Sequence, residues 1–321
     1  MTPVREANLS LAAVREAQIL LSKHLPRTRL VRAPALSSLT GANVFLKLES
    51  ELPTGSFKPR GALYALEANL RRRSISGVVA SSTGNHGAAV AYAAQRLEIP
   101  AYVFLPQNPN PVKRAKITAL GATIFETGHD ISDAWHAASE FSQAHGFYFL
   151  NDATDPDLPA GPAAIGLEIL EELPDADAIY VPMGDTALIR GIAAVAKQLS
   201  SKVRVIGVQA KEAPSYYLSW LEGKAIPTES CNTIADGLAT RTPDATNVEA
   251  IKRLVDDVRL VTEQELLSAV RCLLFEEHVV AEPSGAAGTA ALLQESGSGT
   301  GNIVLIVSGA NIAPDVLRLA I

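Results

Sequence analysis

Short apolar runs rich in β-branched residues alternate with amphipathic stretches of helix length along almost the whole chain. This alternation predicts parallel sheets covered by helices on both faces, because parallel strands are joined by crossovers that pack back onto the sheet. The expected fold class is therefore α/β. Expected strands include residues 44–48, 77–81, 101–105, 122–126, 147–150, 178–182, 204–208, 259–261 and 303–307, and expected helices include residues 58–72, 85–97, 111–120, 132–144, 163–172 and 263–277.

Composition limits the classes of function. A chain of 321 residues, 47% of them apolar, suits one large α/β unit or two lobes that share an interface. The net charge of −6 argues against a nucleic-acid partner, which is bound mainly through clustered Lys and Arg. The two cysteines, Cys231 and Cys272, lie far apart, which argues against a disulfide scaffold. We expect a cytoplasmic protein with no signal peptide, no membrane partner and no membrane span.

Lys58 is the first candidate for chemistry. It lies in the segment PTGSFKPRG at residues 53–61, just after an expected strand and at the start of an expected helix. A lysine amine at the positive end of a helix has its charged form disfavoured, which helps a nucleophilic or Schiff-base role. Taken alone, a surface lysine explains the position as well.

Three other polar segments also follow expected strands, where open parallel sheets bind their ligands. Residues 81–87 (SSTGNHG) offer hydroxyls, glycines and a helix start that suit a carboxylate, although a simple N-cap would explain part of the pattern. Residues 181–191 (VPMGDTALIRG) are a plausible phosphate-binding turn. In residues 303–312 an expected strand is followed by Ser308 and Asn311, which could contact a ligand at the edge of the sheet. An ordinary turn explains these two residues equally well.

The order of these segments is more specific than any one of them. SFKPRG, then STGNHG, then the Gly184 loop, then SGAN resembles the serine/threonine dehydratase family, which are fold-type II pyridoxal phosphate enzymes and include serine racemase. The resemblance covers nearly the whole chain. It implies a two-lobed fold like the tryptophan synthase β chain, with residues 77–147 as a small domain inserted into a large one made of residues 1–76 and 148–321.

The resemblance also implies site residues. Lys58 would carry pyridoxal 5'-phosphate as a Schiff base and move protons at the substrate's Cα, and Thr83 stands where racemases of the family carry a catalytic serine. The other implied contacts are Phe57 beside the cofactor ring, Asn85 at its phenolic oxygen, Ser308 at its nitrogen, Gly184, Asp185, Thr186, Ala187 and Leu188 around the phosphate, and Ser82, Thr83, Gly84, Asn85 and His86 at the substrate carboxylate.

Three departures from the family pattern affect the interpretation. The usual four glycines of the phosphate loop are replaced by GDTA at residues 184–187, and Asp185 would repel a phosphate unless it points away or pairs with Arg190. We expect helix N-terminal amides and the Thr186 hydroxyl to bind the phosphate instead. Thr83 makes racemisation less favoured than elimination. Gln209 and Ser215 replace two acidic metal ligands of some members, so no tight divalent-metal site is expected.

The expected activity is elimination of water from L-threonine, L-serine or a bulkier 3-hydroxy amino acid, giving a 2-oxo acid and ammonia. An amino acid racemase or a β- or γ-replacement synthase on the same scaffold remains open. A non-catalytic binding protein disagrees with the joint presence of Lys58, Asn85 and Ser308. The family also implies a homodimer.

Overall fold

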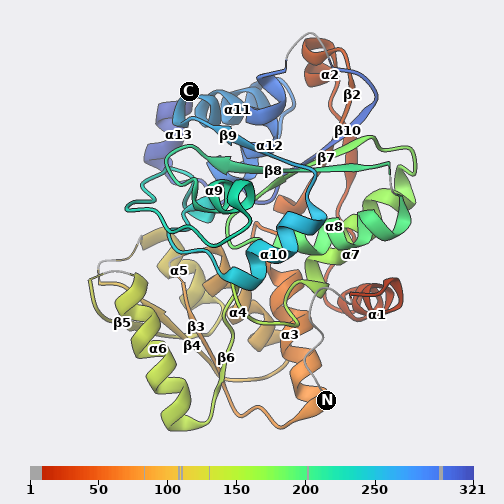
Figure 1. Cartoon of the computed structure of the whole chain (residues 1–321). Coiled ribbons are helices and arrows are strands. Elements are labelled where there is room, and N and C mark those ends of the chain that lie inside the picture. The colour runs from red at the N-terminus through yellow and green to blue at the C-terminus, as the bar shows by residue number, and fades with distance from the viewer. Residues whose placement is uncertain are drawn as a thin grey trace.

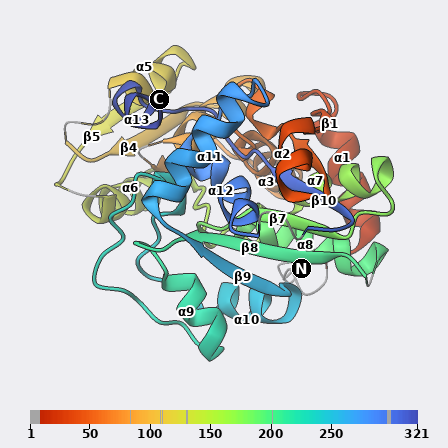
Figure 2. The same ribbon diagram turned by 90° about the horizontal axis from the view of Figure 1, so that it is seen from above.

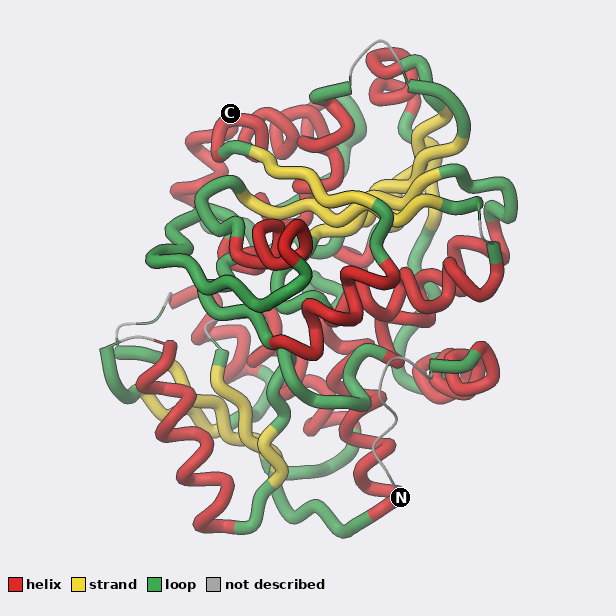
Figure 3. Tube along the Cα trace, in the orientation of Figure 1, coloured by secondary structure: helices red, strands yellow, loops and turns green. Residues whose placement is uncertain are grey.

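The computed structural model describes residues 9–82, 84–107, 109, 111–129, 131–200, 202–295 and 299–321. Its strands form two separate sheets, which lie in different parts of the molecule in Figures 1 and 3. Helices cover both sheets, which confirms the α/β prediction.

The larger sheet has the order β1-β2-β10-β7-β8-β9. Its strands are β1 (Leu30–Arg32), β2 (Asn43–Lys47), β7 (Ala178–Pro182), β8 (Arg204–Ala210), β9 (Asp257–Val261) and β10 (Asn302–Ile306). They run parallel except β1, which pairs antiparallel with β2 at the edge. The sheets are thus parallel as expected, and the antiparallel β1 is a three-residue edge strand too short to show a periodicity in the sequence.

The smaller sheet has the order β5-β4-β3-β6 and is parallel throughout. Its strands are β3 (Val78–Ser81), β4 (Ala101–Leu105), β5 (Thr123–Glu126) and β6 (Tyr148–Phe149). This sheet falls close to the expected inserted domain of residues 77–147. That the two units behave as separate domains stays a prediction.

The helices are α1 (Leu11–Leu21), α2 (Pro34–Thr40), α3 (Lys58–Arg72), α4 (Asn85–Arg96), α5 (Pro111–Ala119), α6 (Ile131–His145), α7 (Ala160–Glu172), α8 (Ala187–Leu199), α9 (Ser215–Glu222), α10 (Ala245–Leu254), α11 (Glu263–Phe275), α12 (Pro283–Leu293) and α13 (Pro314–Ala320), with short 3-10 turns at Glu49–Glu51 and Asp236–Leu238. Helix α12 is buried around its whole circumference between α11 and the larger sheet (Figure 2). It therefore has no polar face from which a helical period can be read.

A buried ionic network fixes the start of α3. The guanidinium of Arg60 donates to both carboxylate oxygens of Glu49 at 2.8 and 2.9 Å, and to Glu168 of α7 at 2.7 and 3.0 Å. Lys47 Nζ, at the end of β2, donates to Glu168 Oε2 at 2.6 Å. All four side chains are at most 4% exposed. Two cations and two carboxylates thus balance one another away from water and tie β2, α3 and α7 together.

We expect Glu168→Gln to destabilise the protein by about 3–5 kcal/mol, because it leaves the buried Lys47 and Arg60 without one of their two counter-charges. Urea unfolding followed by circular dichroism measures the change. The matched control is Glu171→Gln, on the same helix but with a side chain 32% exposed in its pair with Arg15, for which a change of about 0–1 kcal/mol is expected. Equal losses in the two variants would contradict a special role for the buried network.

The same network predicts a dependence on pH. Burial raises the pKa of Glu168, but the charges and hydrogen bonds of Arg60 and Lys47 outweigh this and leave the pKa below its usual value. Because the folded-state pKa is depressed, the contribution of Glu168 is present above the unfolded pKa of about 4.3 and is lost as the pH falls through the folded-state value. The wild-type protein should therefore lose more stability between neutral pH and pH 4 or below than E168Q does, in unfolding curves recorded across that range.

Candidate active site

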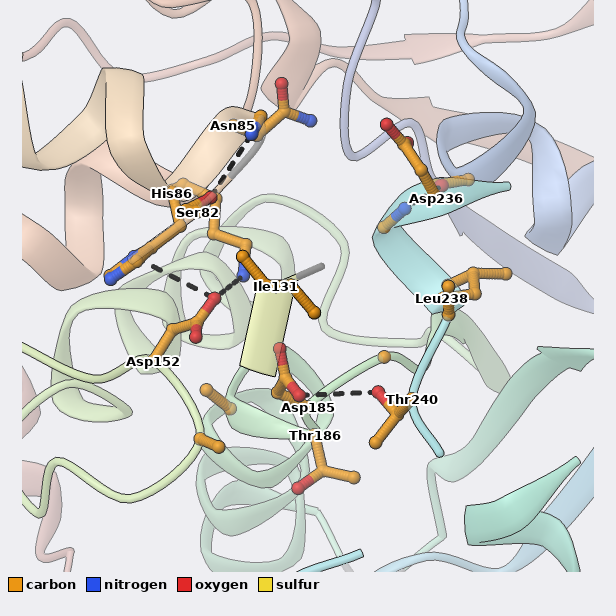
Figure 4. Close-up of a pocket in the computed structure, with 18 of the residues that line it drawn as sticks. Ser82, Asn85, His86, Ile131, Asp152, Asp185, Thr186, Asp236, Leu238 and Thr240 are labelled. Carbon is orange, nitrogen blue, oxygen red and sulfur yellow. Dashed lines mark hydrogen bonds and ion pairs between the residues drawn. The ribbon is translucent and has the colours of Figure 1, made fainter. Parts of the chain in front are cut away.

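Loops from both sheets converge on one cavity of about 820 Å³ (Figure 4). The loops that follow β3, β6, β7 and β10 all contribute lining residues, among them Ser82, Asp152, Gly184 and Ser308. The carboxyl ends of parallel strands are where α/β proteins place ligands, and the polar segments found in the sequence meet here as expected.

Lys58 is held by contacts on both sides of it. An isolated β-bridge joins Ser56 to Gly309, and Phe57 N donates to Ser308 O at 3.0 Å. Helix α3 then begins at Lys58 and is anchored two residues later by Arg60. The amine is therefore carried on a rigid backbone at the point where α3 meets the loop after β10.

The Lys58 amine donates to Asp152 Oδ2 at 2.7 Å. Burial lowers the pKa of Lys58, but the charges of Asp152 and Asp185 and the hydrogen bond to Asp152 outweigh burial and raise it. Burial raises the pKa of the Asp152 carboxyl, but the charge of Lys58 and its hydrogen bond outweigh burial and hold the pKa well below its usual range. In the free protein the lysine is thus an ammonium ion paired with a carboxylate.

His86 lies beneath this pair. Its Nε2 is 2.9 Å from the carbonyl oxygen of Leu150, so that nitrogen carries the proton, and its Nδ1 is 3.8 Å from Asp152 Oδ2. Burial lowers the pKa of His86. The imidazole is therefore a neutral support for the loop that carries Asp152.

Asn85, the first residue of α4, is the centre of a second group of contacts. Its Nδ2 donates to Glu282 Oε1 at 2.6 Å, and its Oδ1 accepts from Asn311 Nδ2 at 2.6 Å. A Cβ on Gly309 would lie 2.0 Å from Glu282 Oε1, so only glycine fits between them. Burial raises the pKa of Glu282 despite these contacts and the nearby lysines Lys113 and Lys116.

The loop from Gly184 to Thr186 and the first two residues of α8, Ala187 and Leu188, line the cavity. A Cβ on Gly184 would lie 2.1 Å from the carbonyl oxygen of Gly237, so the close approach of the two loops requires glycine there. Thr186 adopts a left-handed conformation with φ 69°. Its Oγ1 is buried and has no hydrogen-bond partner within the described part of the chain. The helix start and this hydroxyl are donors that suit an anion.

Asp185 does not turn away from the cavity. Its carboxylate projects into the lined space in Figure 4, where Oδ1 accepts from Thr240 Oγ1 at 3.3 Å. Burial and the neighbouring charge of Asp152 raise the pKa of Asp185 to about 6, against the opposing charges of Lys58 and Arg190. Of the two arrangements named from the sequence, the carboxylate pointing away or pairing with Arg190, the first is not adopted (Figure 4).

The residues proposed from the sequence are brought together. Phe57, Lys58, Ser82, Gly84, Asn85, His86, Gly184, Asp185, Thr186, Ala187, Leu188 and Ser308 all line the cavity, and Thr83 lies outside the described residues. Sequence reasoning missed Asp152 and Glu282 as site residues. Asp152 lies shortly after the end of β6, and Glu282 directly precedes α12. Such positions at strand ends and helix starts are the signal that could have indicated them.

Gln209 and Ser215, which replace acidic metal ligands of some family members, take part in hydrogen bonds with other parts of the chain. Gln209 Oε1 accepts from Tyr217 N at 2.9 Å, and Ser215 Oγ donates to Thr240 O at 2.5 Å. Within the described ranges, no three or more His, Cys, Asp or Glu side chains form a group that could bind a metal ion. No helix in those ranges is long and apolar enough to cross a membrane.

Comparison with known proteins gives consistent results. Residues 21–309 match a family described as "Pyridoxal-phosphate dependent enzyme". An L-threonine ammonia-lyase of Thermotoga maritima is 37% identical over 95% of this chain and 76% of its own length. Maize serine racemase superposes with a TM-score of 0.90 at 30% identity, covering 97% of this chain and 96% of that one. Threonine deaminase isoform 2 of Solanum lycopersicum superposes with a TM-score of 0.89 at 29% identity, covering 97% of this chain and 93% of that one.

Replacing Asp152 by Asn is expected to lower the pKa of the Lys58 amine, because it removes the nearest of the charges that raise it. In cofactor-free protein, the rate at which a small acylating reagent modifies Lys58 rises with pH as the amine loses its proton. In D152N this rise should occur at a lower pH than in the wild type. Peptide mapping by mass spectrometry measures this rate. The control is Asp236→Asn, at the rim of the same cavity and paired with Lys113. If D152N and D236N leave the Lys58 profile equally unchanged, the ion pair does not set the pKa.

Proposed function

The chain belongs to the family of pyridoxal-phosphate dependent enzymes, and on this premise we propose that it eliminates water from a small β-hydroxy amino acid, releasing a 2-oxo acid and ammonia. The observation that carries the proposal is the placement of the Lys58 amine in a cavity that is also lined by the loop before α8 and by the start of α4. The named ammonia-lyase and threonine deaminase relatives support the choice of reaction.

The residues present fit the cofactor. Thr186 Oγ1, a buried hydroxyl to which no described residue gives a hydrogen bond, lies in the loop before α8. Lys58 and Asn85 face the same space, and Phe57 lines its wall. We propose that residues 184–188 bind the phosphate, that Asn85 binds the phenolic oxygen and that Ser308 faces the ring nitrogen. When bound, pyridoxal phosphate withdraws electrons from the substrate's Cα and so makes the Cα proton removable.

Lys58 is the group that moves protons. With cofactor and substrate bound, its Nζ would remove the Cα proton. Asp152, which already receives a hydrogen bond from Nζ, keeps the amine oriented and stabilises its positive charge after the proton is taken. A base with a fixed direction is needed here, because proton removal must be aligned with loss of the β-hydroxyl.

The loop before α4 is proposed to hold the substrate's carboxylate. Ser82 and Gly84 line the cavity, and Gly84 N donates to Ser82 Oγ at 3.2 Å, which orders the turn. The amides at the start of α4 then point at the ligand, where the helix dipole favours a negative charge. Ser308, as a neutral partner of the ring nitrogen, would leave that nitrogen largely unprotonated, which favours prompt elimination over a long-lived carbanion.

Racemisation is the second candidate, because maize serine racemase has the same architecture over nearly the whole chain. The products distinguish the two activities, since elimination gives a 2-oxo acid and ammonia whereas racemisation of L-serine gives D-serine. We further propose a cytoplasmic homodimer in which the smaller sheet unit closes over the substrate to exclude water.

The test is a product assay with added cofactor. L-threonine and L-serine are expected to give a 2-oxo acid and ammonia in equal amounts, and borohydride should fix the cofactor to the peptide that contains Lys58. Lys58→Ala should lose elimination by about 10³-fold or more. The matched control is Lys197→Ala, whose amine pairs with Asp256 outside the cavity. Dominant formation of D-serine, or cofactor fixed to another residue, would overturn the proposal.

A further inference from the structure

Asp185 places an acid in the loop that the proposed function assigns to a phosphate. Family members with four glycines at this place have no side chain there, whereas this chain directs a carboxyl group into the cavity (Figure 4). We propose that Asp185 binds the cofactor's phosphate as a neutral carboxylic acid, donating its O–H to a phosphate oxygen. The inference rests on the proposed function, because it assumes that the loop binds this phosphate.

The geometry leaves one oxygen available for such a contact. Oδ1 of Asp185 accepts from Thr240 Oγ1 at 3.3 Å. Oδ2 has no hydrogen-bond partner that the described residues supply. The backbone carbonyl of Asp185 is also fixed, since Asn247 Nδ2 lies 3.5 Å from it. The side chain is thus oriented from both ends, with a free oxygen on the cavity side of the loop.

The loop offers other donors beside this oxygen. Thr186 Oγ1 is buried without a partner in the described ranges, and the amides at the start of α8 follow it. Three kinds of donor, a carboxylic O–H, a hydroxyl and backbone N–H groups, would then surround the phosphate. This set replaces the close backbone approach that a run of glycines allows.

The charged groups that act on the Asp185 carboxyl lie on several neighbouring elements. Lys58 at the start of α3 and Arg190 of α8 favour its ionised form, while Asp152 in the loop after β6 favours the neutral form. Tyr216 of α9 lies near enough for Asp185 to raise its pKa. Lys58 is already paired with Asp152 at 2.7 Å, so its charge is largely compensated. Burial adds to the effect of Asp152, and the pKa of Asp185 is about 6 before any phosphate arrives.

A phosphate dianion in contact with this carboxyl would raise its pKa further, because two adjacent anions repel one another. Well below pH 6 Asp185 is mostly protonated already, so binding takes up little proton at this site. Above pH 6 each binding event must protonate Asp185, so the affinity falls by up to tenfold per pH unit until the pH reaches the raised value of the complex. The sign is therefore weaker cofactor binding at higher pH.

The experiment measures the dissociation constant of pyridoxal 5'-phosphate from pH 5.5 to 8.5 by equilibrium dialysis. The proteins are the wild type, Asp185→Asn, which keeps a donor at every pH, and Asp185→Gly, which has neither donor nor charge. At pH 5.5 the wild type should bind roughly tenfold tighter than D185G, since a hydrogen bond to a charged group is present. At pH 8.5 the order should reverse, while D185N stays tighter than D185G throughout.

Two controls isolate the phosphate contact. Pyridoxal, which lacks the phosphate, reports any effect of the variants on Lys58 alone, and it should show no reversal between wild type and D185G. Asp236→Asn, at the rim of the same cavity, should follow the wild-type profile. The second ionisation of the phosphate itself, near pH 6, is shared by all proteins and cancels in the ratios.

A wild type that binds the cofactor no tighter than D185G at every pH would refute the proposal, because Asp185 would then only repel the phosphate. A reversal that also appears with pyridoxal would assign the effect to Lys58 and refute it equally. Failure of all proteins to bind pyridoxal phosphate would instead refute the proposed function, so the two failures can be told apart.

Discussion

The buried network of Lys47, Glu49, Arg60 and Glu168 is the constraint on which the site depends. It joins the end of β2 to the first turn of α3 and to the middle of α7. Ionic groups this deep are costly to bury, and their attraction repays the cost only when every partner is in place. Lys58 lies two residues before Arg60, so the position of the Lys58 amine depends on this network being complete.

The Lys58 side chain and its backbone are held from two sides. Asp152 holds the Lys58 ammonium from the side of β6, while the Phe57 and Ser56 contacts hold the backbone from the side of β10. The ion pair stabilises the charged form of the lysine. Asp152 also raises the pKa of Asp185, so the charge states of Lys58, Asp152 and Asp185 depend on one another.

Much of the fold and part of the site could be predicted from the sequence, and the limits have physical causes. The bounds of α3 were predicted at Lys58–Arg72 because a proline at the second position and three arginines at the end mark a helix locally. Asp152 was not recognised, since its partner Lys58 is 94 residues away and no local pattern connects them. Helix α12 and the short strand β1 lacked a readable period.

Asp185, in the proposed phosphate loop, departs from the family pattern in a way that would preserve phosphate binding through a different set of contacts. A glycine run binds phosphate through backbone amides that nothing obstructs, and its binding has no titrating side chain. Here Thr186 takes the left-handed conformation that glycine would adopt easily, which costs of order 1–3 kcal/mol of backbone strain for a residue with a branched side chain. That strain is tolerated because Gly237 approaches Gly184 closely and Thr240 bonds Asp185, which together fix the loop. Under the proposed function, the side chains of Asp185 and Thr186 would present donors that glycine lacks, and specificity for the phosphate would pass from the backbone to two hydroxyl groups, one of them on a carboxylic acid.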